Sequence, residues 1–140
     1  MAVSKYNSEG YYDPTAYEAL SNVEAIEKSK RYRPLIYICS PFSGDVNRNI
    51  ENARRYCHFA VVKNYIPIAP HLLFPQFLND DIEKERELGL FFSNVLMDHC
   101  SEVWVFGDRV SKGMGAEIER AKRKNYKLRY FSDELKEVFE

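Results

Sequence analysis

Short apolar runs rich in β-forming residues alternate along this sequence with longer amphipathic stretches. The run at 35–39 (LIYIC) stops at Ser-Pro and the run at 102–106 (EVWVF) stops at Gly, as buried parallel strands typically do. The stretch at 47–64 carries apolar residues at helical spacing and charged residues elsewhere. The expected strands are 35–39, 65–69, 102–106 and 127–131, and the expected helices are 47–64, 83–100 and 113–125.

Strands and helices that alternate in this order predict right-handed crossovers and a parallel sheet with helices on both faces. We therefore expect an α/β fold: a three-layer Rossmann- or flavodoxin-like sheet of four or five strands, in the order 2-1-3-4. Segment 71–77 is expected to be a packed loop or a single helical turn, and Ser132-Asp133 to cap a short terminal helix. The expected inner face of the helix at 83–100 comprises Leu88, Phe91, Phe92, Val95, Leu96 and His99.

A chain of 140 residues accommodates one such domain with a short appendage. We expect an N-terminal arm and helix at 1–33, with the helix running from Asp13-Pro14 to about Lys30, and the α/β domain at 34–140.

The 20 basic and 21 acidic residues give a formal net charge of −1, which argues against a nucleic-acid or membrane partner. The sequence has no long apolar run and no signal-peptide pattern, so a cytoplasmic location is expected. Three separated cysteines in apolar runs indicate reduced thiols: Cys39, Cys57 and Cys100.

In a doubly wound sheet, ligands bind outside the carboxyl ends of the strands, where three loops are expected to meet. The first loop, Ser40–Asp45 (SPFSGD), can offer backbone N–H groups and the hydroxyls of Ser40 and Ser43 to an anion. An ordinary turn that caps the next helix explains this loop equally well. The second loop contains His71, which can contact a base, although a histidine satisfied within its own loop is the commoner case.

The third loop, Ser111–Glu117 (SKGMGAE), opens the last long helix. Gly113 and Gly115 let the backbone approach a ligand closely, and Ser111 is a candidate cap or phosphate contact. Glu117 lies beside the inward apolar stripe, where its carboxylate could act as a nucleophile or hold a sugar hydroxyl. On spacing alone, a glutamate that merely complements the helix dipole is the commoner case. No Cys/His spacing resembles a metal site, and no cofactor is expected.

Four segments together resemble the nucleoside 2-deoxyribosyltransferase-like superfamily, and within it the uncharacterised DUF4406-type branch. The segments are YICSPFSGD, IPIAPHLLFPQFL, EVWVFG and SKGMGAEIERA, and the similarity covers 36–130, about two thirds of the chain. The last segment is the most specific, because the superfamily's third-strand loop typically reads S/D-x-G-x-G-x-E-hydrophobic-x-x-A. It is matched at Ser111, Gly113, Gly115, Glu117, Ile118 and Ala121.

The resemblance implies that Glu117 attacks the anomeric carbon of a 2′-deoxynucleoside or its 5′-phosphate, and that a base or water resolves the deoxyribosyl-enzyme. The serine at Ser111 is associated with 5′-phosphate binding in the superfamily's hydrolases, which favours a nucleotide substrate and hydrolysis. Ser40, Phe42, Ser43 and Gly44 would join Ser111 around the phosphate. The resemblance also implies a homodimer or larger homo-oligomer in which a neighbour closes the pocket.

One position departs from the superfamily pattern. The enzymes usually carry an aspartate eight residues before the acidic residue that opens the third strand, and here that position is Asn94. Asparagine cannot donate a catalytic proton, although Asp98, one turn further along the helix, is a possible substitute. Two alternatives therefore stay open beside a nucleotide N-glycosidase or deoxyribosyl transferase. One is a non-catalytic nucleotide-binding module of the same fold, and the other is an interaction protein that assembles through 72–78.

Overall fold

The computed structural model of the protein describes residue 23 and residues 32–139. The chain divides into two compact units, Met1–Arg33 and Pro34–Glu140. The helix expected between Asp13 and Lys30 falls outside the described residues, apart from Val23. The second unit contains the sheet and every element discussed below.

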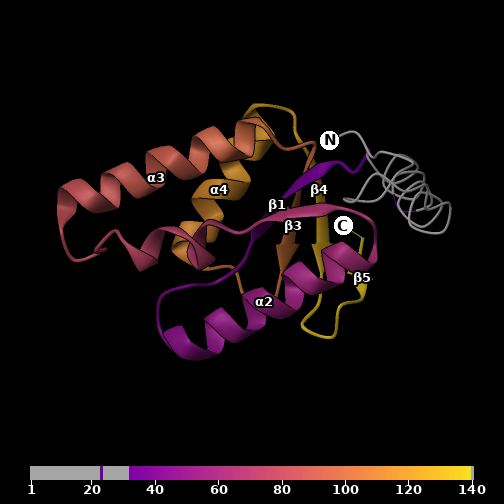
Figure 1. The fold of residues 1–140 in the computed structure, drawn as a ribbon, viewed down its shortest axis with the longest axis horizontal. Coiled ribbons are helices and arrows are strands. Elements are labelled where there is room, and N and C mark those ends of the chain that lie inside the picture. Colours follow the sequence, from indigo (N-terminus) through magenta and orange to yellow (C-terminus); the bar gives the residue numbers. More distant parts are fainter. Residues whose placement is uncertain (1–22, 24–31, 140) are drawn as a thin grey trace, which may run out of the picture. The chain divides into compact units, whose positions relative to one another are not determined.

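The second unit is built on a five-stranded sheet, and Figure 1 shows its strands beside the helices that cover them. The strand order is β2-β1-β3-β4-β5, so the predicted order 2-1-3-4 of the first four strands is confirmed. These four strands are parallel, and β5 pairs antiparallel with β4. The strands span Leu35–Cys39 (β1), Ile66–Ile68 (β2), Glu102–Phe106 (β3), Lys127–Phe131 (β4) and Glu137–Val138 (β5).

Three helices cover the sheet: α2 (Val46–Val62), α3 (Glu83–Asp98) and α4 (Lys112–Arg123). In Figure 1, α2 lies on one face of the sheet and α3 and α4 lie on the other. The connection from β2 to α3 contains two 3-10 turns, η1 (Pro70–Leu72) and η2 (Phe74–Gln76), where a packed loop or a single turn was expected. Each turn has a proline near its start, where the fixed φ of proline favours a helical turn.

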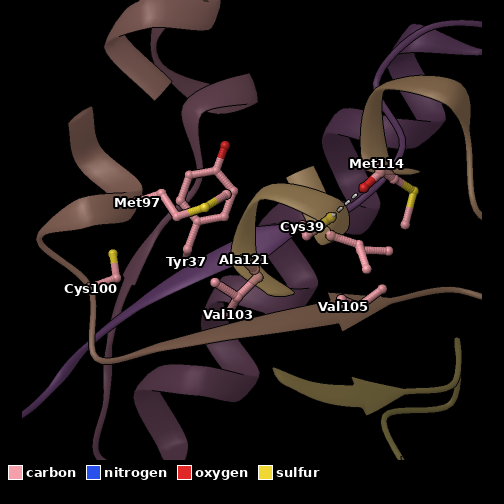
Figure 2. Close-up of a cluster of buried hydrophobic side chains, with 9 residues drawn as sticks. Tyr37, Cys39, Met97, Cys100, Val103, Val105, Met114 and Ala121 are labelled. Carbon is pink, nitrogen blue, oxygen red and sulfur yellow. Dashed lines mark hydrogen bonds between the residues drawn. The ribbon is translucent and has the colours of Figure 1, made fainter. Parts of the chain in front are cut away.

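Alternation along the strands divides the core between the two faces of the sheet. Ile36 and Ile38 of β1 pack with Tyr56 and Ala60 of α2 and with Trp104. Tyr37 and Cys39 point to the other face and pack against α3 and α4, as the close-up in Figure 2 shows. This second cluster is completed by Met97, Cys100, Val103, Val105, Met114, Ile118 and Ala121.

The end of the chain differs from the sequence prediction. Residues after Ser132 form a tight hairpin rather than a helix: the Leu135 N–H donates to the Ser132 carbonyl, and Leu135 adopts a left-handed φ of 64°. The returning strand β5 is then held by Arg129, whose Nε and Nη2 donate to the Glu137 carboxylate at 2.9 and 2.8 Å. A bidentate pair across neighbouring strands favours the hairpin over a short helix.

The inner face of α3 is also rotated from the predicted one. Phe92 and Leu96 are partly covered, as expected, but Leu88, Phe91, Val95 and His99 are exposed. The buried anchor of this helix is Met97, followed by Cys100 just beyond its end. Because α3 carries apolar residues around most of its circumference, the spacing alone does not determine which face meets the sheet.

Candidate functional site

A cavity of about 210 Å³ opens at the carboxyl end of β1. It lies where the loop after β1, the turns η1 and η2, the first half of α3 and the start of α4 meet, as expected for a ligand site in a doubly wound sheet. Its lining residues are Ser40, Phe42, Ser43, Pro70, His71, Phe74, Pro75, Leu78, Asp80, Glu85, Arg86, Gly89, Leu90, Ser93, Ser111, Gly113, Met114 and Glu117.

Glu117 is placed in this cavity by the way α4 starts and packs. Ser111 caps the helix, accepting a hydrogen bond from the Met114 N–H at 3.2 Å. Met114, Ile118 and Ala121 bury the inner stripe of α4, so Glu117, beside that stripe, is directed toward β1 and the cavity. Its Oε2 atom is buried and has no hydrogen-bond partner within residues 32–139. Burial raises the pKa of this carboxyl group to about 7.

Tyr37 of β1 is the partner of Glu117. The Tyr37 hydroxyl donates a hydrogen bond to the Glu117 carboxylate, which lowers the pKa of Glu117 and partly offsets the effect of burial. Tyr37 also interacts with Ser93 of α3. Burial and the neighbouring Glu117 keep the pKa of Tyr37 well above its usual value, so the phenol remains a proton donor at neutral pH. In Figure 2 its hydroxyl points away from the apolar cluster in which its ring is packed.

Sequence reasoning missed Tyr37, although a signal for it exists. A buried tyrosine usually needs a partner for its hydroxyl, and Tyr37 is the polar member of an otherwise apolar strand. Alternation places it on the same face as Cys39, the residue just before the first loop. α4 covers that face of the sheet. The alternation of side chains along β1 therefore indicates that Tyr37 contacts the first turns of α4.

Serine side chains gather at the end of the cavity nearest the start of α4. Ser40, Ser43 and Ser111 all line it, together with Gly113. Ser40 is 1% exposed, and its hydroxyl has no hydrogen-bond partner among the described residues. A Cβ atom at Gly113 would meet nothing within 4 Å, so the backbone there borders open space. Hydroxyls beside the N-terminus of a twelve-residue helix form an environment suited to an anion.

His71 and Phe42 form one wall of the cavity. Their rings stack with centroids 5.3 Å apart and an interplanar angle of 12°. The imidazole also donates a hydrogen bond to the backbone carbonyl of Ser40. Burial lowers the pKa of His71, so the ring is neutral at physiological pH. A flat, uncharged wall of this kind can stack against a planar ligand.

Four predicted site residues do not line the cavity: Gly44, Asn94, Asp98 and Gly115. Gly44 has a left-handed φ of 98° in the loop after β1, where Asn49 Nδ2 donates to the Phe42 and Ser43 carbonyls and fixes the turn. On α3 the cavity is lined by Ser93 instead of its neighbour Asn94.

Asp98 lies in a separate polar cluster that joins α3 to α4 and β4. Its carboxylate accepts hydrogen bonds from Arg120 Nη2 at 3.0 Å, Lys124 Nζ at 3.2 Å and the Tyr126 hydroxyl at 2.6 Å. These donors hold the pKa of Asp98 well below its usual value. Asp98 does not line the cavity, and its carboxylate is engaged by these three donors. The structure therefore gives no support to the hypothesis that Asp98 replaces the missing aspartate as a proton donor.

The structure adds three charged residues to the predicted lining: Asp80, Glu85 and Arg86. Glu83 and Glu85 lie in the first turn of α3, where acidic side chains complement the helix dipole. Glu85 and Arg86, at the start of α3, also border the cavity. Helix periodicity does not predict this position, because the loop before α3 determines where the helix begins relative to the sheet.

Within the part of the chain that the structure describes, no helix has the length and hydropathy needed to cross a membrane. Among these residues, no group of three or more His, Cys, Asp or Glu side chains is arranged to hold a metal ion.

Comparisons with known proteins agree with this architecture. Residues 34–131 match the model of a family described as a domain of unknown function, DUF7768, whereas the motifs had suggested DUF4406, so that branch assignment is corrected. No curated protein matches the sequence. A solved structure, the 2-deoxyribosyltransferase from the psychrotolerant bacterium Bacillus psychrosaccharolyticus, is similar with a TM-score of 0.60 and 13% identity. The similarity covers 70% of this chain and 72% of that one, and it confirms the predicted Rossmann- or flavodoxin-like fold.

Proposed function

We propose that this chain, which belongs to the DUF7768 family, cleaves the N-glycosidic bond of a 2′-deoxynucleoside 5′-phosphate with Glu117 as the nucleophile. The observation that carries the proposal is the state of Glu117: its carboxylate lies in the cavity, Oε2 has no partner among the described residues, and the Tyr37 hydroxyl holds the group. A desolvated carboxylate with a free oxygen is well suited to covalent catalysis. The fold, shared with an enzyme named a 2-deoxyribosyltransferase, supports the same chemistry.

The proposed reaction has two steps. A Glu117 carboxylate oxygen forms a bond to C1′ of the sugar while the C1′–N bond breaks. The electron pair of that bond stays on the base nitrogen, which takes up a proton from solvent water. Water then attacks C1′, loses its proton and releases Glu117 as a carboxylate. If a second base replaces water in this step, its ring nitrogen attacks C1′ and loses its proton, the product is a new 2′-deoxynucleoside 5′-phosphate, and the reaction is a transfer.

The serine end of the cavity supports a nucleotide as the substrate. Ser40, Ser43 and Ser111 would donate their hydroxyls to the 5′-phosphate, and the N-terminus of α4 would stabilise its charge. Glu117 is four residues beyond Gly113, one turn along α4, so a phosphate at the helix start leaves the sugar within reach of the carboxylate. Ser111 in place of an aspartate favours hydrolysis over transfer.

A second candidate function is a nucleotide-binding module without turnover. Asn94 favours the binding module, because the enzymes of the superfamily that the sequence resembles usually carry an aspartate at this position. In this chain Ser93, and not Asn94, lines the cavity. A departing base without a proton donor leaves slowly. Saturable binding of a nucleotide with no product after long incubation would identify this function.

We also propose that the chain assembles as a homodimer or larger homo-oligomer through the outer apolar face of α3. Phe91 of α3 and Phe77, just after η2, are each 61% exposed, which is unusual for such large side chains. Phe91 contacts Phe92 and Phe77 contacts Phe74, a cavity-lining residue, so a second copy on this surface would lie at the cavity's rim. Phe91→Glu should reduce the mass measured by light scattering, and a monomeric wild type at micromolar concentration would contradict the assembly.

The direct test of the proposed activity is release of free base from 2′-deoxynucleosides and their 5′-monophosphates, followed by chromatography. The wild type should release base from at least one monophosphate, and Glu117→Ala should reduce that release by at least about a thousandfold. Release that survives in Glu117→Ala would reject the nucleophile. Binding without release from any member would favour the binding module.

A further inference from the structure

Ser93 is the residue through which helix α3 reaches the reacting pair. Its side chain lines the cavity together with Glu117, and its hydroxyl interacts with the hydroxyl of Tyr37, the partner of Glu117. The Ser93 hydroxyl also donates a hydrogen bond to the Gly89 carbonyl, one turn earlier in α3, at 2.8 Å. A hydrogen-bonded chain therefore joins Ser93 of α3, Tyr37 of β1 and Glu117 of α4.

The hydroxyl protons give this chain a direction. Each hydroxyl has one proton to donate, and Tyr37 donates its own to the Glu117 carboxylate, so the phenol oxygen remains an acceptor. Burial keeps the pKa of Tyr37 high, but the interaction with Ser93 lowers it, which is the effect of a donor to the phenol oxygen. Ser93 is therefore the donor to Tyr37, as Tyr37 is the donor to Glu117.

The Gly89 carbonyl is a second acceptor for the Ser93 hydroxyl, and it does not depend on that hydroxyl. Gly89 and Ser93 lie four residues apart within α3, so the Gly89 carbonyl also has the Ser93 backbone N–H as its helical donor. A hydroxyl hydrogen rotates about its C–O bond without movement of the heavy atoms. Ser93 can therefore turn its proton to Tyr37 and leave no carbonyl without a partner.

The charge on Glu117 changes during the proposed reaction, and the chain from Ser93 responds to that charge. Glu117 is a carboxylate before the first step, an uncharged ester in the deoxyribosyl-enzyme and a carboxylate again after the second step. Hydrogen bonds in a chain strengthen one another, and those to a charged acceptor are the strongest. Donation from Ser93 to Tyr37 therefore stabilises the departing carboxylate more than it stabilises the ester.

We propose that Ser93 is a positioning residue of the second half-reaction, in which it acts through Tyr37 on the departing Glu117 carboxylate. In this step the water oxygen forms a bond to C1′ while the bond between C1′ and the Glu117 oxygen breaks. The electron pair of the broken bond stays on Glu117, and the proton of the attacking water passes to solvent. Ser93 and Tyr37 keep their protons throughout. The inference rests on the proposed function, because it assigns a role within the same reaction.

The test measures the two half-reactions separately, at pH 9, with a sugar-labelled 2′-deoxynucleoside 5′-monophosphate. Rapid quenching follows formation of the labelled enzyme, and a chase with unlabelled nucleotide follows its breakdown. Ser93→Ala should slow breakdown about fivefold, the effect of one hydrogen bond, and should not slow formation. Ser93→Thr keeps the hydroxyl and should restore breakdown. The control is Ser101→Ala, at an exposed serine outside the cavity, which should behave as the wild type.

A titration of Glu117 by carbon NMR without substrate shows whether Ser93 acts through Tyr37. The resonance is identified by its loss in Glu117→Gln. Ser93→Ala should raise the pKa of Glu117, because its carboxylate loses stabilisation, whereas Ser93→Ala/Tyr37→Phe should match Tyr37→Phe. Other titratable or charged groups around the chain are present in every variant, so their effects cancel. Among the described residues they include Cys39, His71, Asp80, Glu85, Arg86 and Arg120.

The outcomes separate this inference from the function on which it rests. Equal losses in both half-reactions, breakdown at the wild-type rate in Ser93→Ala, or no rescue by Ser93→Thr would overturn the role of Ser93 and leave Glu117 as the nucleophile. A pKa increase of equal size with and without Tyr37 would also overturn it. If the wild type neither releases base from any 2′-deoxynucleoside 5′-monophosphate nor becomes labelled, the proposed function fails and this inference fails with it.

Discussion

The Tyr37 hydroxyl donates a hydrogen bond to the Glu117 carboxylate across the interface of β1 and α4. The contact joins a strand residue packed inside the sheet's core to a residue near the start of a helix, so its geometry is set by the fold rather than by a loop. It acts on Glu117 in opposition to burial: desolvation favours the protonated acid, and the hydrogen bond favours the carboxylate. The pKa of Glu117 is set by this balance.

Tyr37→Phe should raise the pKa of Glu117 above its value of about 7, because the variant removes the donor and keeps the apolar ring. The pH at which kcat/KM is half-maximal should move to a higher value, and activity at pH 7 should fall. A pH–rate profile of both proteins measures the shift. An unchanged profile with a uniformly lower rate would indicate that Tyr37 only supports packing.

The activity of the wild type should rise with pH through about 7, since only the carboxylate form of Glu117 is a nucleophile. Below that value, kcat/KM should fall about tenfold for each pH unit. Steady-state base release between pH 5 and 9 tests the ascending limb. Activity that declines as the pH rises from 5 to 7 would assign the ionising group a role as an acid instead.

Folding stability should change with pH in the opposite direction. The folded-state pKa of Glu117, about 7, lies above its ordinary value of 4.5, so the folded chain binds the proton more tightly than the unfolded chain. Stability is therefore lost as the pH rises from about 4.5 to 7, by an amount on the order of 3 kcal/mol if no other group compensates. Glu117→Gln should raise Tm relative to the wild type at pH 8 and change it little at pH 4. A variant that is less stable than the wild type at pH 8 would contradict this balance.

Ser40→Ala should weaken nucleotide binding without destabilising the fold. The hydroxyl is buried and unpaired within the described residues, so its removal should leave Tm unchanged or slightly higher. KM for a 5′-monophosphate should rise about tenfold, while KM for the unphosphorylated nucleoside should stay nearly constant. Equal losses for both substrates would place Ser40 away from the phosphate.

Asp98→Asn should lower stability and leave the chemical step unchanged, because Asp98 binds Arg120, Lys124 and Tyr126 away from the cavity. Its folded-state pKa is depressed, so its contribution is present at neutral pH and is lost as the pH falls toward and through that low value. Thermal unfolding at pH 7 and pH 2, beside kcat at pH 7, separates the effects. A large loss of kcat at unchanged Tm would restore Asp98 as a candidate acid.

The sequence was sufficient to predict the strand order and the end of the sheet at which the cavity opens. Strand-to-helix loops of a parallel sheet must meet at one edge, so Ser40, Ser111 and Glu117 could be grouped from their loops alone. The contact between Tyr37 and Glu117 requires knowing that α4 covers the face to which odd-numbered residues of β1 point. To predict that Arg86 lines the cavity, one must know which face of α3 is turned toward the sheet. Apolar residues lie around most of that helix, so the sequence alone does not determine its rotation.

The most direct measurement is the location of a covalent intermediate. The wild type is mixed with a 2′-deoxynucleoside 5′-monophosphate labelled in the sugar and quenched in acid during turnover, and its peptides are mapped by mass spectrometry. The proposed chemistry predicts the labelled sugar on the peptide that contains Glu117, and no label in Glu117→Gln. Undiminished base release by Glu117→Gln, with no sugar bound to either protein, would contradict it.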